Sequence, residues 1–330
     1  MTGVGWKLSR LAGILFLVFI CQACADRGKV FDIDGSSTVY PISLAVAEEY
    51  TILHPGARLT VAFSGTGGGF ERFCRGEVEV NDASRVIDAA EVAACRMRGI
   101  SFIELPVALD AITVAVSAQN DFVRCLTVHE LRRMFAPGSA VTTWRDVRPE
   151  WPRQAIQFFT PGTDSGTFDY FTHAVVGKAG ASRTDVFPSE DDNVLVQGTA
   201  ASPFAIGYFG YAYYRENRNR LRAVAVDDGG GCVSPTPDTI TSGAYVPLSR
   251  PLFMYVAAQA ADINAQLGGF VRFYLSPEAR PYIADTGYLP LSGAVYQLAE
   301  RRFEEHVTGS AFMDFAPGDS ITSTVSEGLP

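Results

Sequence analysis

Three short segments rich in glycine, serine and threonine carry the side chains best suited to hold a ligand. They are Asp34-Gly-Ser-Ser-Thr-Val39, Ser64-Gly-Thr-Gly-Gly-Gly-Phe70 and Thr163-Asp-Ser-Gly-Thr-Phe168. Each follows an apolar run typical of a strand and precedes a helical pattern, which places it where a helix begins. A helix start leaves backbone N–H groups unpaired and carries partial positive charge, so these segments are suited to bind an anion.

Other interpretations compete for the same loops. Ser, Thr and Asp are common helix N-caps, which explains any one loop but explains three less well. The second loop lacks the Lys-Ser/Thr of a nucleotide P-loop, and its glycine spacing departs from the dinucleotide fingerprint at Phe70. The third is similar to the nucleophile turn of trypsin-like proteases, but neither His54 nor His129 lies in a context that supports a catalytic base. We therefore favour a cleft lined by helix starts.

Composition limits the classes of protein to consider. The chain has 330 residues, of which 47% are hydrophobic, enough for a large core and about two domains, and this excludes full disorder. Its 36 acidic residues against 27 basic ones argue against a general nucleic-acid binder. The four histidines cluster neither with each other nor with the cysteines, so we predict no metal site.

The loops need strands and helices to position them, and the chain alternates between the two. We predict strands over 30–33, 59–63, 78–81, 111–117, 156–160 and 252–257, and a hairpin-like segment over 208–214. We predict helices over 41–53, 70–75, 126–135, 168–176, 263–274 and 294–305. This alternation indicates an α/β fold in which a mostly parallel sheet is flanked by helices on both faces.

Two of those strands divide the chain. The strands over 111–117 and 252–257 bracket the middle of the sequence, and we interpret them as crossings into and out of an inserted domain. The first domain is then discontinuous, with residues 25–112 and 251–330, and the second holds residues 113–250. Two polar loops fall in the first domain and one in the second, and the crossings become the candidate hinges.

The first residues have the character of a secretory signal. Lys7 and Arg10 precede an apolar stretch, 11–20, that is too short to span a bilayer comfortably, and small residues follow it. We predict that residues 1–24 are a signal peptide and that the mature protein is extracytoplasmic. Two processing routes stay open, namely cleavage after Ala25 and lipid attachment to Cys24.

Four cysteines follow the leader, and an oxidising compartment makes disulfides plausible among them. They are Cys74, Cys95, Cys125 and Cys232. Four cysteines allow three connectivities. We favour Cys74–Cys95, which would close a loop of about twenty residues and contribute roughly 3 kcal/mol in the chain-entropy model. The pair Cys125–Cys232 is the weaker prediction.

An ordered series of segments extends from residue 30 to residue 290. The segments are Asp34-Gly-Ser-Ser-Thr-Val-Tyr-Pro41, Phe63-Ser-Gly-Thr-Gly-Gly-Gly-Phe70 with Phe73-Cys74, Asp82-Ala-Ser-Arg85, Asp164-Ser-Gly-Thr-Phe-Asp169, Ser189-Glu-Asp-Asp-Asn193, Ile206-Gly-Tyr-Phe-Gly210 and Tyr245-Val-Pro-Leu-Ser-Arg-Pro251. Together they resemble the substrate-binding protein of the ABC-type high-affinity phosphate transporter, in the branch found in cyanobacteria and related bacteria.

The resemblance implies the two-domain type II fold of periplasmic binding proteins, with a hinged cleft and no cofactor. It implies a binding protein, not an enzyme, that delivers inorganic phosphate to the membrane permease subunits of an ABC transporter. The protein would be a periplasmic monomer without nucleic-acid partners. Its membrane contact would be limited to a lipid anchor at Cys24, if that residue is modified.

Carried over residue by residue, the resemblance assigns phosphate-binding groups to all three loops. The first loop contributes Ser37 and Thr38, the second Thr66, and the third Ser165, Gly166 and Thr167. Charge is the one departure. In the best-known branch of the family an aspartate follows Ala-Ser and an arginine precedes Ser-Gly-Thr, whereas here Arg85 and Asp164 hold these places in exchanged order.

The exchanged pair still suits phosphate. A carboxylate accepts hydrogen bonds and donates none, so Asp164 would favour phosphate, which keeps an O–H near neutral pH, over sulfate. Arg85 would hold two oxygens with its planar guanidinium and offset the charge of the acid. The alternatives that stay open are another tetrahedral oxyanion such as sulfate or arsenate, a secreted phosphatase-like enzyme, and a phosphate sensor or adhesin without transport.

Overall fold

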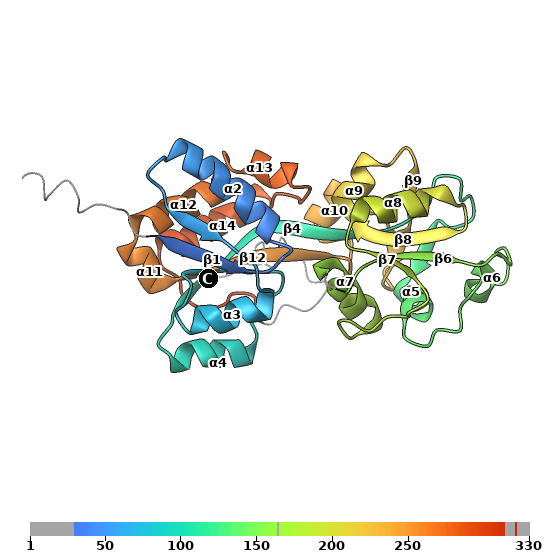
Figure 1. Ribbon diagram of the computed structural model, residues 1–330, viewed down its shortest axis with the longest axis horizontal. Coiled ribbons are helices and arrows are strands. Elements are labelled where there is room, and N and C mark those ends of the chain that lie inside the picture. Colours follow the sequence, from blue (N-terminus) through green and yellow to red (C-terminus); the bar gives the residue numbers. More distant parts are fainter. Residues whose placement is uncertain (1–29, 164, 314–320, 322–330) are drawn as a thin grey trace, which may run out of the picture.

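The computed structural model describes residues 30–163, 165–313 and 321 of the chain. Figure 1 shows two lobes side by side, joined by the long strands β4 (Phe102–Ser117) and β12 (Ser249–Ala257). The predicted leader with Cys24, and the predicted ligand Asp164, lie outside the described residues. Within the described ranges, none of the helices has the length and apolar character that a membrane span requires.

The first lobe begins with the strand–loop–helix units that the sequence predicts. Strand β1 (Phe31–Gly35) pairs in parallel with β2 (Leu59–Val61) and with β3 (Val80–Ala83). Parallel neighbours need a crossover connection, which two helices supply. These are α2 (Tyr40–Leu53), between β1 and β2, and α3 (Thr66–Cys74), between β2 and β3. Helix α4 (Ala89–Met97) follows β3 and packs beside α3.

Strands β4 and β12 run antiparallel to each other through both lobes, with Ser249 opposite Ala111 and Arg250 opposite Asp110. Strand β4 is sixteen residues long and buried throughout, so its prediction over 111–117 covers only its second half. Its first half contains Glu104, which interrupts the apolar run in the sequence. The structure satisfies this carboxylate internally, because it accepts hydrogen bonds from Tyr255 Oη (2.7 Å) and Ser310 Oγ (2.8 Å).

The second lobe continues the same sheet. Strand β8 (Ala205–Gly210) pairs antiparallel with β4 and parallel with β6 (Gln157–Pro161), and β6 pairs in parallel with β7 (Phe187–Ser189). The edge strand β9 (Leu221–Ala223) pairs with β4. The whole sheet is therefore mixed, with parallel pairs at both ends and antiparallel pairs around the two long strands. The predicted α/β class is confirmed.

The predicted hairpin over 208–214 is wrong. Strand β8 ends at Gly210, and helix α9 (Tyr211–Glu216) follows it directly. The tyrosines on either side of this boundary have different environments, because Tyr208 is fully buried in the sheet whereas Tyr214 is half-buried on the helix. Helix α8 (Asp192–Ala201) packs against β8 and completes this side of the lobe.

Several predicted helices change their bounds. The helix over 126–135 is α5 (Val128–Phe135), because 125–127 form strand β5. The helix over 168–176 begins earlier, as α7 (Gly166–Phe171), and ends as the π-helix η1 (Thr172–Val176). The remaining helices are α6 (Trp144–Val147), α10 (Pro237–Thr241), α11 (Ala258–Ile263), α12 (Ala265–Leu275), α13 (Arg280–Asp285) and α14 (Gly293–Glu304).

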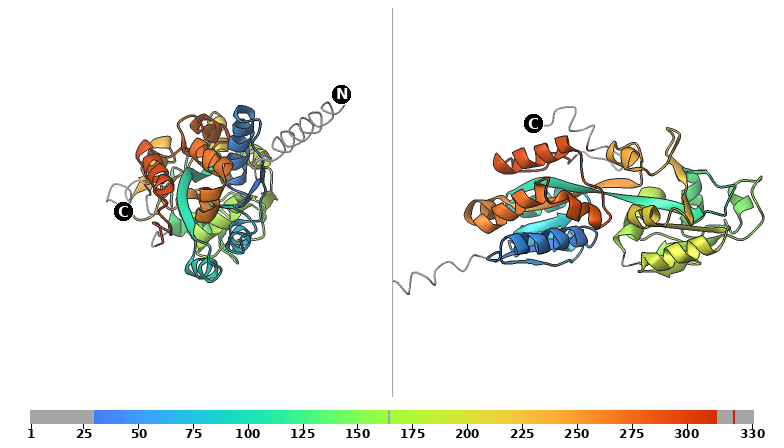
Figure 2. Two further views of the ribbon diagram at one scale, coloured as in Figure 1. Left: turned by 90° about the vertical axis from the view of Figure 1, so that its left-hand side faces the viewer. Right: turned by 90° about the horizontal axis from the view of Figure 1, so that it is seen from above.

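The predicted helix over 263–274 is broken at Asn264. Its side-chain oxygen accepts hydrogen bonds from the backbone of Gln266 and Leu267, which caps a new helix start. Helix α12 then lies with α2 on one face of the first-lobe sheet, while α3 and α4 cover the other (Figure 1). Figure 2, seen from above, shows the two lobes meeting along β4.

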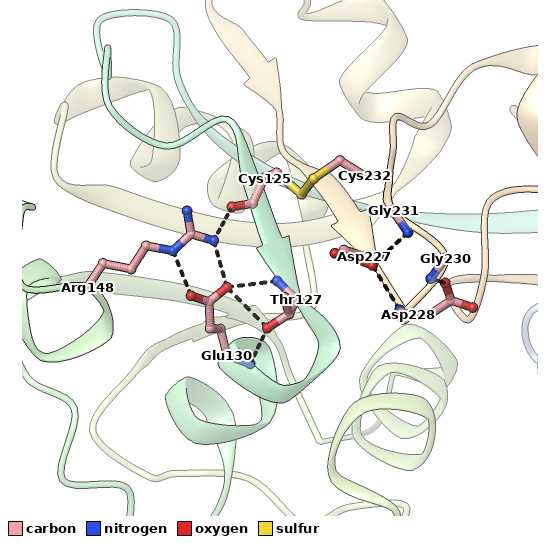
Figure 3. The surroundings of a disulfide bond; sticks show 10 residues. Cys125, Thr127, Glu130, Arg148, Asp227, Asp228, Gly230, Gly231 and Cys232 are labelled. Carbon is pink, nitrogen blue, oxygen red and sulfur yellow. Dashed lines mark hydrogen bonds and ion pairs between the residues drawn. A yellow bond between two sulfur atoms is a disulfide. The ribbon is translucent and has the colours of Figure 1, made fainter.

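Both predicted disulfides are present. Cys74–Cys95 joins α3 to α4 in the first lobe. Cys125–Cys232 joins β5 (Cys125–Thr127) to β11 (Cys232–Val233), the outer strands of a small sheet whose centre is β10 (Ala225–Asp227) (Figure 3). Beside it, Arg148 donates to the backbone oxygen of Cys125 and forms an ion pair with Glu130.

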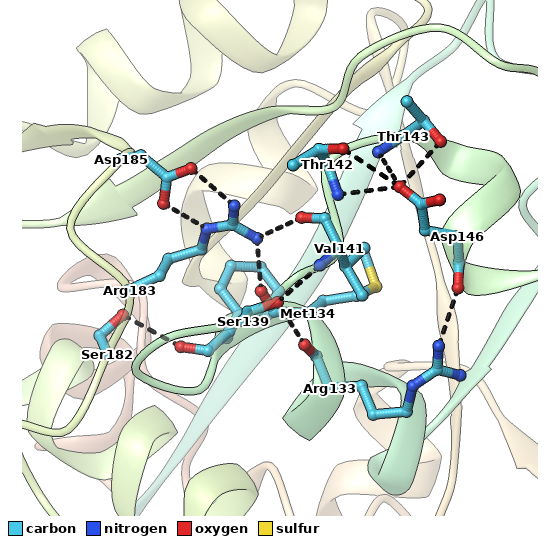
Figure 4. A network of polar contacts seen from close by, with 11 residues as sticks. Arg133, Met134, Ser139, Val141, Thr142, Thr143, Asp146, Ser182, Arg183 and Asp185 are labelled. Carbon is cyan, nitrogen blue, oxygen red and sulfur yellow. Dashed lines mark hydrogen bonds and ion pairs between the residues drawn. The ribbon is translucent and has the colours of Figure 1, made fainter.

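A buried arginine, Arg183, holds together several connecting segments of the second lobe by hydrogen bonds and an ion pair. Arg183 donates to the backbone oxygens of Met134 (2.8 Å) and Val141 (2.9 Å), forms an ion pair with Asp185, and lies 4.0 Å from the centre of the Phe158 ring (Figure 4). Its planar guanidinium can make these contacts together, so one side chain anchors two surface loops to the core.

Candidate functional site

A cavity of about 1050 Å³ lies between the lobes. Residues from the first two polar loops, from the end of β3, from α7 and from β12 line it. They include Ser36, Ser37, Thr38, Gly65, Thr66, Gly67, Ser84, Arg85, Gly166, Tyr170 and Arg250. Five predicted ligands, from four separate parts of the chain, are thus brought to one cavity, and these are Ser37, Thr38, Thr66, Arg85 and Gly166.

The first two polar loops are tied to each other. The backbone N–H groups of Ser64 and Gly65 donate to the oxygen of Gly35, at 3.0 and 2.8 Å. Ser36 N donates to the oxygen of Asp82 (2.9 Å), which fixes the first loop to β3. Thr66 Oγ1 lies 3.2 Å from Ser84 Oγ. The loops therefore form one continuous rim of small polar groups.

Two buried carboxyl groups lie behind this rim. Asp34 accepts a hydrogen bond from Ser64 Oγ (2.9 Å) and forms an ion pair with Arg72 of α3. Asp82 accepts from Ser43 Oγ of α2 (2.6 Å). Burial, and to a smaller extent the charge of Asp34, raise the pKa of Asp82 to about 7. A carboxyl group that is partly neutral at neutral pH adds less repulsion toward an anion bound in front of it.

The second lobe meets this rim at the start of α7. Ser165 caps the helix, and its Oγ accepts a hydrogen bond from Thr167 N (3.2 Å). Gly166 lies so close to the first loop that a Cβ atom there would overlap Thr38 Oγ1. Only glycine permits this approach. Ser165 and Thr167 flank Gly166 without lining the cavity themselves.

Arg250 connects the two sides of the cavity. Its guanidinium forms an ion pair with Asp110 (3.1 Å) and donates to Thr38 Oγ1 (3.3 Å) and to the backbone oxygen of Ser84 (3.3 Å). It also lies 4.2 Å from the centre of the Tyr170 ring on α7. The side chains of Arg250 and Asp110 are 13% and 7% exposed, so this charge is largely withdrawn from solvent. A cation in such a place interacts strongly with an anion.

Arg85 lies at the outer part of the cavity. Both ends of its guanidinium donate to the carboxylate of Glu91, at 2.8 and 2.7 Å, and it lies 5.6 Å from the centre of the Phe70 ring. Its side chain is 45% exposed. Glu91 also accepts from the backbone of Asp88 as part of the cap of α4. Arg85 is therefore held within the first lobe and is less buried than Arg250.

Comparison with known proteins identifies the family. A family model described as the PBP superfamily domain matches residues 24–278. The chain belongs to this superfamily. Protein SphX of Synechocystis sp. is 44% identical over 97% of this chain and 99% of its own length. The phosphate-binding protein PstS of Staphylococcus haemolyticus is 36% identical, over 80% of this chain and 82% of its own.

The fold of this PBP-superfamily member also matches solved structures. A crystal structure of "a possible phosphate binding protein" from Planctomyces limnophilus has a TM-score of 0.76 and 43% identity, and the match covers 84% of this chain and 98% of that one. An ABC-type phosphate transport receptor from Vibrio cholerae has a TM-score of 0.66 at 22% identity, which supports the fold alone.

Three members of this cavity, Arg250, Asp110 and Tyr170, are not among the ligands predicted from the sequence. Arg250 occurs there only within the segment Tyr245–Pro251 that carries the resemblance. A signal was available, because Arg250 stands between Ser249 and Pro251 in an otherwise apolar strand, and an isolated charge in a buried strand needs a partner. The partner could not be identified without the register of β4 and β12.

Proposed function

We propose that this protein binds inorganic phosphate in the cavity between its lobes and delivers it to the membrane permease of an ABC transporter. The observation that carries the proposal is the convergence of two polar loops, the start of α7 and the buried Arg250 on one cavity. The relatives named phosphate-binding protein support the same choice of anion. We infer a solute-binding component and not an enzyme.

The proposed ligands divide by chemistry. Hydroxyl and backbone N–H donors come from Ser37, Thr38 and Thr66 in the first lobe and from Ser165, Gly166 and Thr167 in the second. Arg250 is the principal cation, and Asp110 holds it in place. Arg85 acts from the outer part of the cavity, and Asp164 accepts the O–H of the phosphate and thereby disfavours sulfate.

We propose that the lobes correspond to a first domain of residues 25–112 and 251–330 and a second of residues 113–250. The pairing of Arg250 with Asp110 across β12 and β4 supports a boundary at this point of both strands. The hinges would be the crossings over 111–117 and 250–255. Because each domain supplies part of the donor set, phosphate would favour the closed arrangement by its additional contacts there.

We propose that the mature protein is an extracytoplasmic monomer, either cleaved after Ala25 or anchored through a lipid on Cys24. The two disulfides support an oxidising compartment. Mass spectrometry of the protein purified from membrane and soluble fractions would distinguish an N-terminal diacylglyceryl cysteine from a chain that starts after Ala25.

Calorimetry with phosphate, sulfate and arsenate tests the proposed anion. We expect the wild-type protein to bind phosphate and to reject sulfate. In the Arg250→Gln/Asp110→Asn double variant, which leaves no unpaired buried charge, phosphate affinity should fall roughly 100-fold because a charge-assisted contact is lost. Arg272→Gln is the matched control, since Arg272 is paired with Glu304 and exposed. Binding of sulfate as tightly as phosphate would refute the choice of anion.

A further inference from the structure

Large apolar side chains are exposed mainly at one end of the first lobe. Nine are exposed in the part of the chain that the structure describes, and four of these line the cavity or lie on the second lobe, namely Phe63, Met313, Phe187 and Val194. The other five belong to the first lobe and do not line the cavity, and they are Val30, Ile52, Leu53, Met97 and Ile263. Isolated exposed apolar residues are common on proteins, whereas several at one place mark an interaction surface.

These five residues lie where the strands of the first lobe begin. Val30 precedes β1, and Leu53 ends α2, which leads to β2, a parallel neighbour of β1. Met97 ends α4, which leads to β4, and Ile263 ends α11, which follows β12. Because β12 is antiparallel to β3 and β4, it ends at the edge of the sheet where those strands begin. Figure 1 shows the ends of α2, α4 and α11 at the outer end of this lobe, away from the second lobe.

Hydrogen bonds join these segments to one another. Phe31 N donates to the oxygen of Arg58 (3.3 Å), and Arg58 N donates to Gln266 Oε1 (3.1 Å) at the start of α12. Gln259 Nε2 of α11 donates to the oxygen of Gly99 (3.2 Å), in the turn after α4. The segments therefore form one surface. We call it the end face and define it as the five exposed apolar residues together with the exposed arginines Arg58, Arg96 and Arg98.

The charge of the end face differs from that of the whole chain, which is acidic. Arg96 and Arg98 stand on either side of Met97, and all three are exposed. Apolar side chains interspersed with arginines suit the surface of a lipid bilayer, because the apolar groups enter the boundary of the acyl chains and the arginines contact anionic headgroups.

Several acidic residues near the end face have partners of their own. Glu77 pairs with Arg75 (2.6 Å), and Asp262 pairs with His306 (3.2 Å). Glu79 accepts a hydrogen bond from the backbone of Asp32 (2.9 Å). These contacts reduce the repulsion that the acidic groups would exert on an anionic surface.

The place where β1 begins indicates what the end face contacts. Val30, which immediately precedes β1, follows Cys24 by six residues. Six residues span at most about 22 Å even when fully extended. A lipid on Cys24 therefore keeps the end face beside the bilayer, whereas no such link brings it to another protein.

We propose that the end face lies on the surface of the lipid bilayer when the protein is anchored through Cys24. The inference rests on the proposed lipid anchor and not on the phosphate site, which is at the opposite side of the first lobe, between the lobes. Because the lipid already holds the chain at the surface, a weak contact is sufficient. The same weakness lets the protein leave this orientation when it meets a permease.

Tryptophan probes in anchored protein test the contact. Trp144 and Trp151, the tryptophans that follow the leader, are buried in the second lobe, so a new tryptophan on the surface reports on its own position. The four cysteines after Cys24 are paired in disulfides, so the thiol of Cys24 can be coupled to a maleimide lipid. The vesicles contain equal parts of phosphatidylcholine and phosphatidylglycerol with brominated acyl chains, which quench a tryptophan that reaches them.

Leu53→Trp and Met97→Trp place probes on two separate segments of the end face. Each should lose about half of the added fluorescence, since interfacial apolar groups reach the acyl boundary. Phe187→Trp is the matched control, because Phe187 is 57% exposed and Leu53 55%, but Phe187 lies on the second lobe. Its fluorescence should be unchanged. Adding Arg96→Gln/Arg98→Gln to Leu53→Trp should reduce the quenching at least twofold, because contacts with anionic headgroups are lost.

Absence of quenching at both end-face positions, or equal quenching in Phe187→Trp, would overturn the inference. A dimer of the mature chain in sedimentation that Leu53→Asp/Met97→Asp converts to a monomer would also overturn it, because the end face would then contact a second copy. So would mass spectrometry that finds no lipid on Cys24. Phosphate calorimetry on the wild type is a separate readout, and its failure would refute the proposed anion without changing the quenching result.

Discussion

The two lobes hold their parts of the cavity in different ways. In the first lobe the polar loops are supported by the lobe's own core, through the buried carboxyl groups of Asp34 and Asp82 and through close glycine packing. In the second lobe the contact is the start of α7, a helix of six residues. Its buried hydroxyl contact is with the segment that leads out of the lobe, because Tyr170 Oη lies 2.7 and 2.8 Å from the oxygens of Pro247 and Ser249, where the chain enters β12.

This difference suggests that the first lobe provides a fixed part of the site and that the second lobe provides a part that can move. The loops of the first lobe have buried partners in the same lobe, so their position does not depend on contacts with the second lobe. The start of α7 is fixed through β12, one of the two strands that cross between the lobes. A movement of those strands would therefore displace the second-lobe contact and leave the first-lobe loops in place. The four predictions that follow test or refine this comparison.

The disulfides offer the largest expected effect, with one bond in each lobe. Cys125–Cys232 spans 107 residues and Cys74–Cys95 spans 21. The chain-entropy model assigns about 5 kcal/mol of folding free energy to the longer loop and about 3 kcal/mol to the shorter. We expect urea unfolding of the Cys125→Ser/Cys232→Ser variant to show the larger loss, with Cys74→Ser/Cys95→Ser as its counterpart. A larger loss of unfolding free energy in Cys74→Ser/Cys95→Ser would mean that the first lobe depends on its disulfide more than the chain-entropy model predicts.

Asp82 and Asp146 should give the two lobes opposite responses to pH. The pKa of Asp82 is raised from about 3.8 when unfolded to about 7 when folded, so the folded state disfavours the ionised form. Its destabilising effect is absent below about pH 4, grows as pH rises, and is complete above pH 7, where it reaches the order of 4 kcal/mol. Asp82→Asn should therefore gain stability relative to wild type as pH rises from 4 to 8.

Asp146 provides the control of opposite sign. Backbone hydrogen bonds from Thr143 and Thr142 lower its pKa to about 2, so it stabilises the fold above pH 4 and loses this effect as pH falls toward 2. Unfolding free energies of wild type, Asp82→Asn and Asp146→Asn across pH 2–8 check both statements. If the difference in unfolding free energy between Asp82→Asn and wild type does not change with pH, folding does not raise the pKa of Asp82.

Gly69 tests the packing of the first-lobe loops. A Cβ atom at Gly69 would overlap Asn81 Oδ1 and lie 2.5 Å from the Cα of Gly35, which is backbone and cannot move aside cheaply. Gly69→Ala should cost about 3 kcal/mol of stability and weaken phosphate binding by displacing the first loop. Gly67, in the same helix, has no neighbour nearer than Arg85 at 3.8 Å. Gly67→Ala should therefore raise stability by about 0.5–1 kcal/mol, as alanine does within helices.

Some of the features behind these predictions can be recognised in the sequence, and others cannot. The strand–loop–helix units of the first lobe and the disulfide pairs were predictable, because glycine, serine and threonine mark turns and because few cysteines limit the pairing. Five of the eight predicted ligands line the cavity, Ser165 and Thr167 flank it, and Asp164 lies outside the described residues. Local signals were sufficient here because each loop directly follows its own strand.

The parts that could not be predicted depend on long-range pairing. Arg250 contacts Asp110, which is 140 residues away, through the register of β12 against β4. Tyr170 reaches carbonyl oxygens 77 and 79 residues further along the chain. Arg250 stands out as a charge in an apolar strand, but no local pattern identifies the partner in either contact. The false hairpin over 208–214 has a related cause, because strand and helix meet at Gly210 without a loop, and only the packing of β8 against β4 separates them.

The smallest expected effect is also the sharpest test of the comparison. Tyr170→Phe removes the hydroxyl that lies against β12 and keeps the ring beneath Arg250. Tyr296→Phe is its first-lobe counterpart, since Tyr296 Oη donates to the oxygen of Val107 at 2.9 Å in a buried site. Each variant should lose about 1 kcal/mol of stability, the usual net value of one hydrogen bond. Only Tyr170→Phe should also weaken phosphate binding, by roughly fivefold, because it frees the start of α7 from the strand that positions Arg250.

Thermal unfolding and calorimetry on both variants separate the loss of stability from the loss of phosphate affinity. Equal phosphate affinities in the two variants would mean that the contact with the start of β12 does not position α7, and the proposed difference between the lobes would then be wrong.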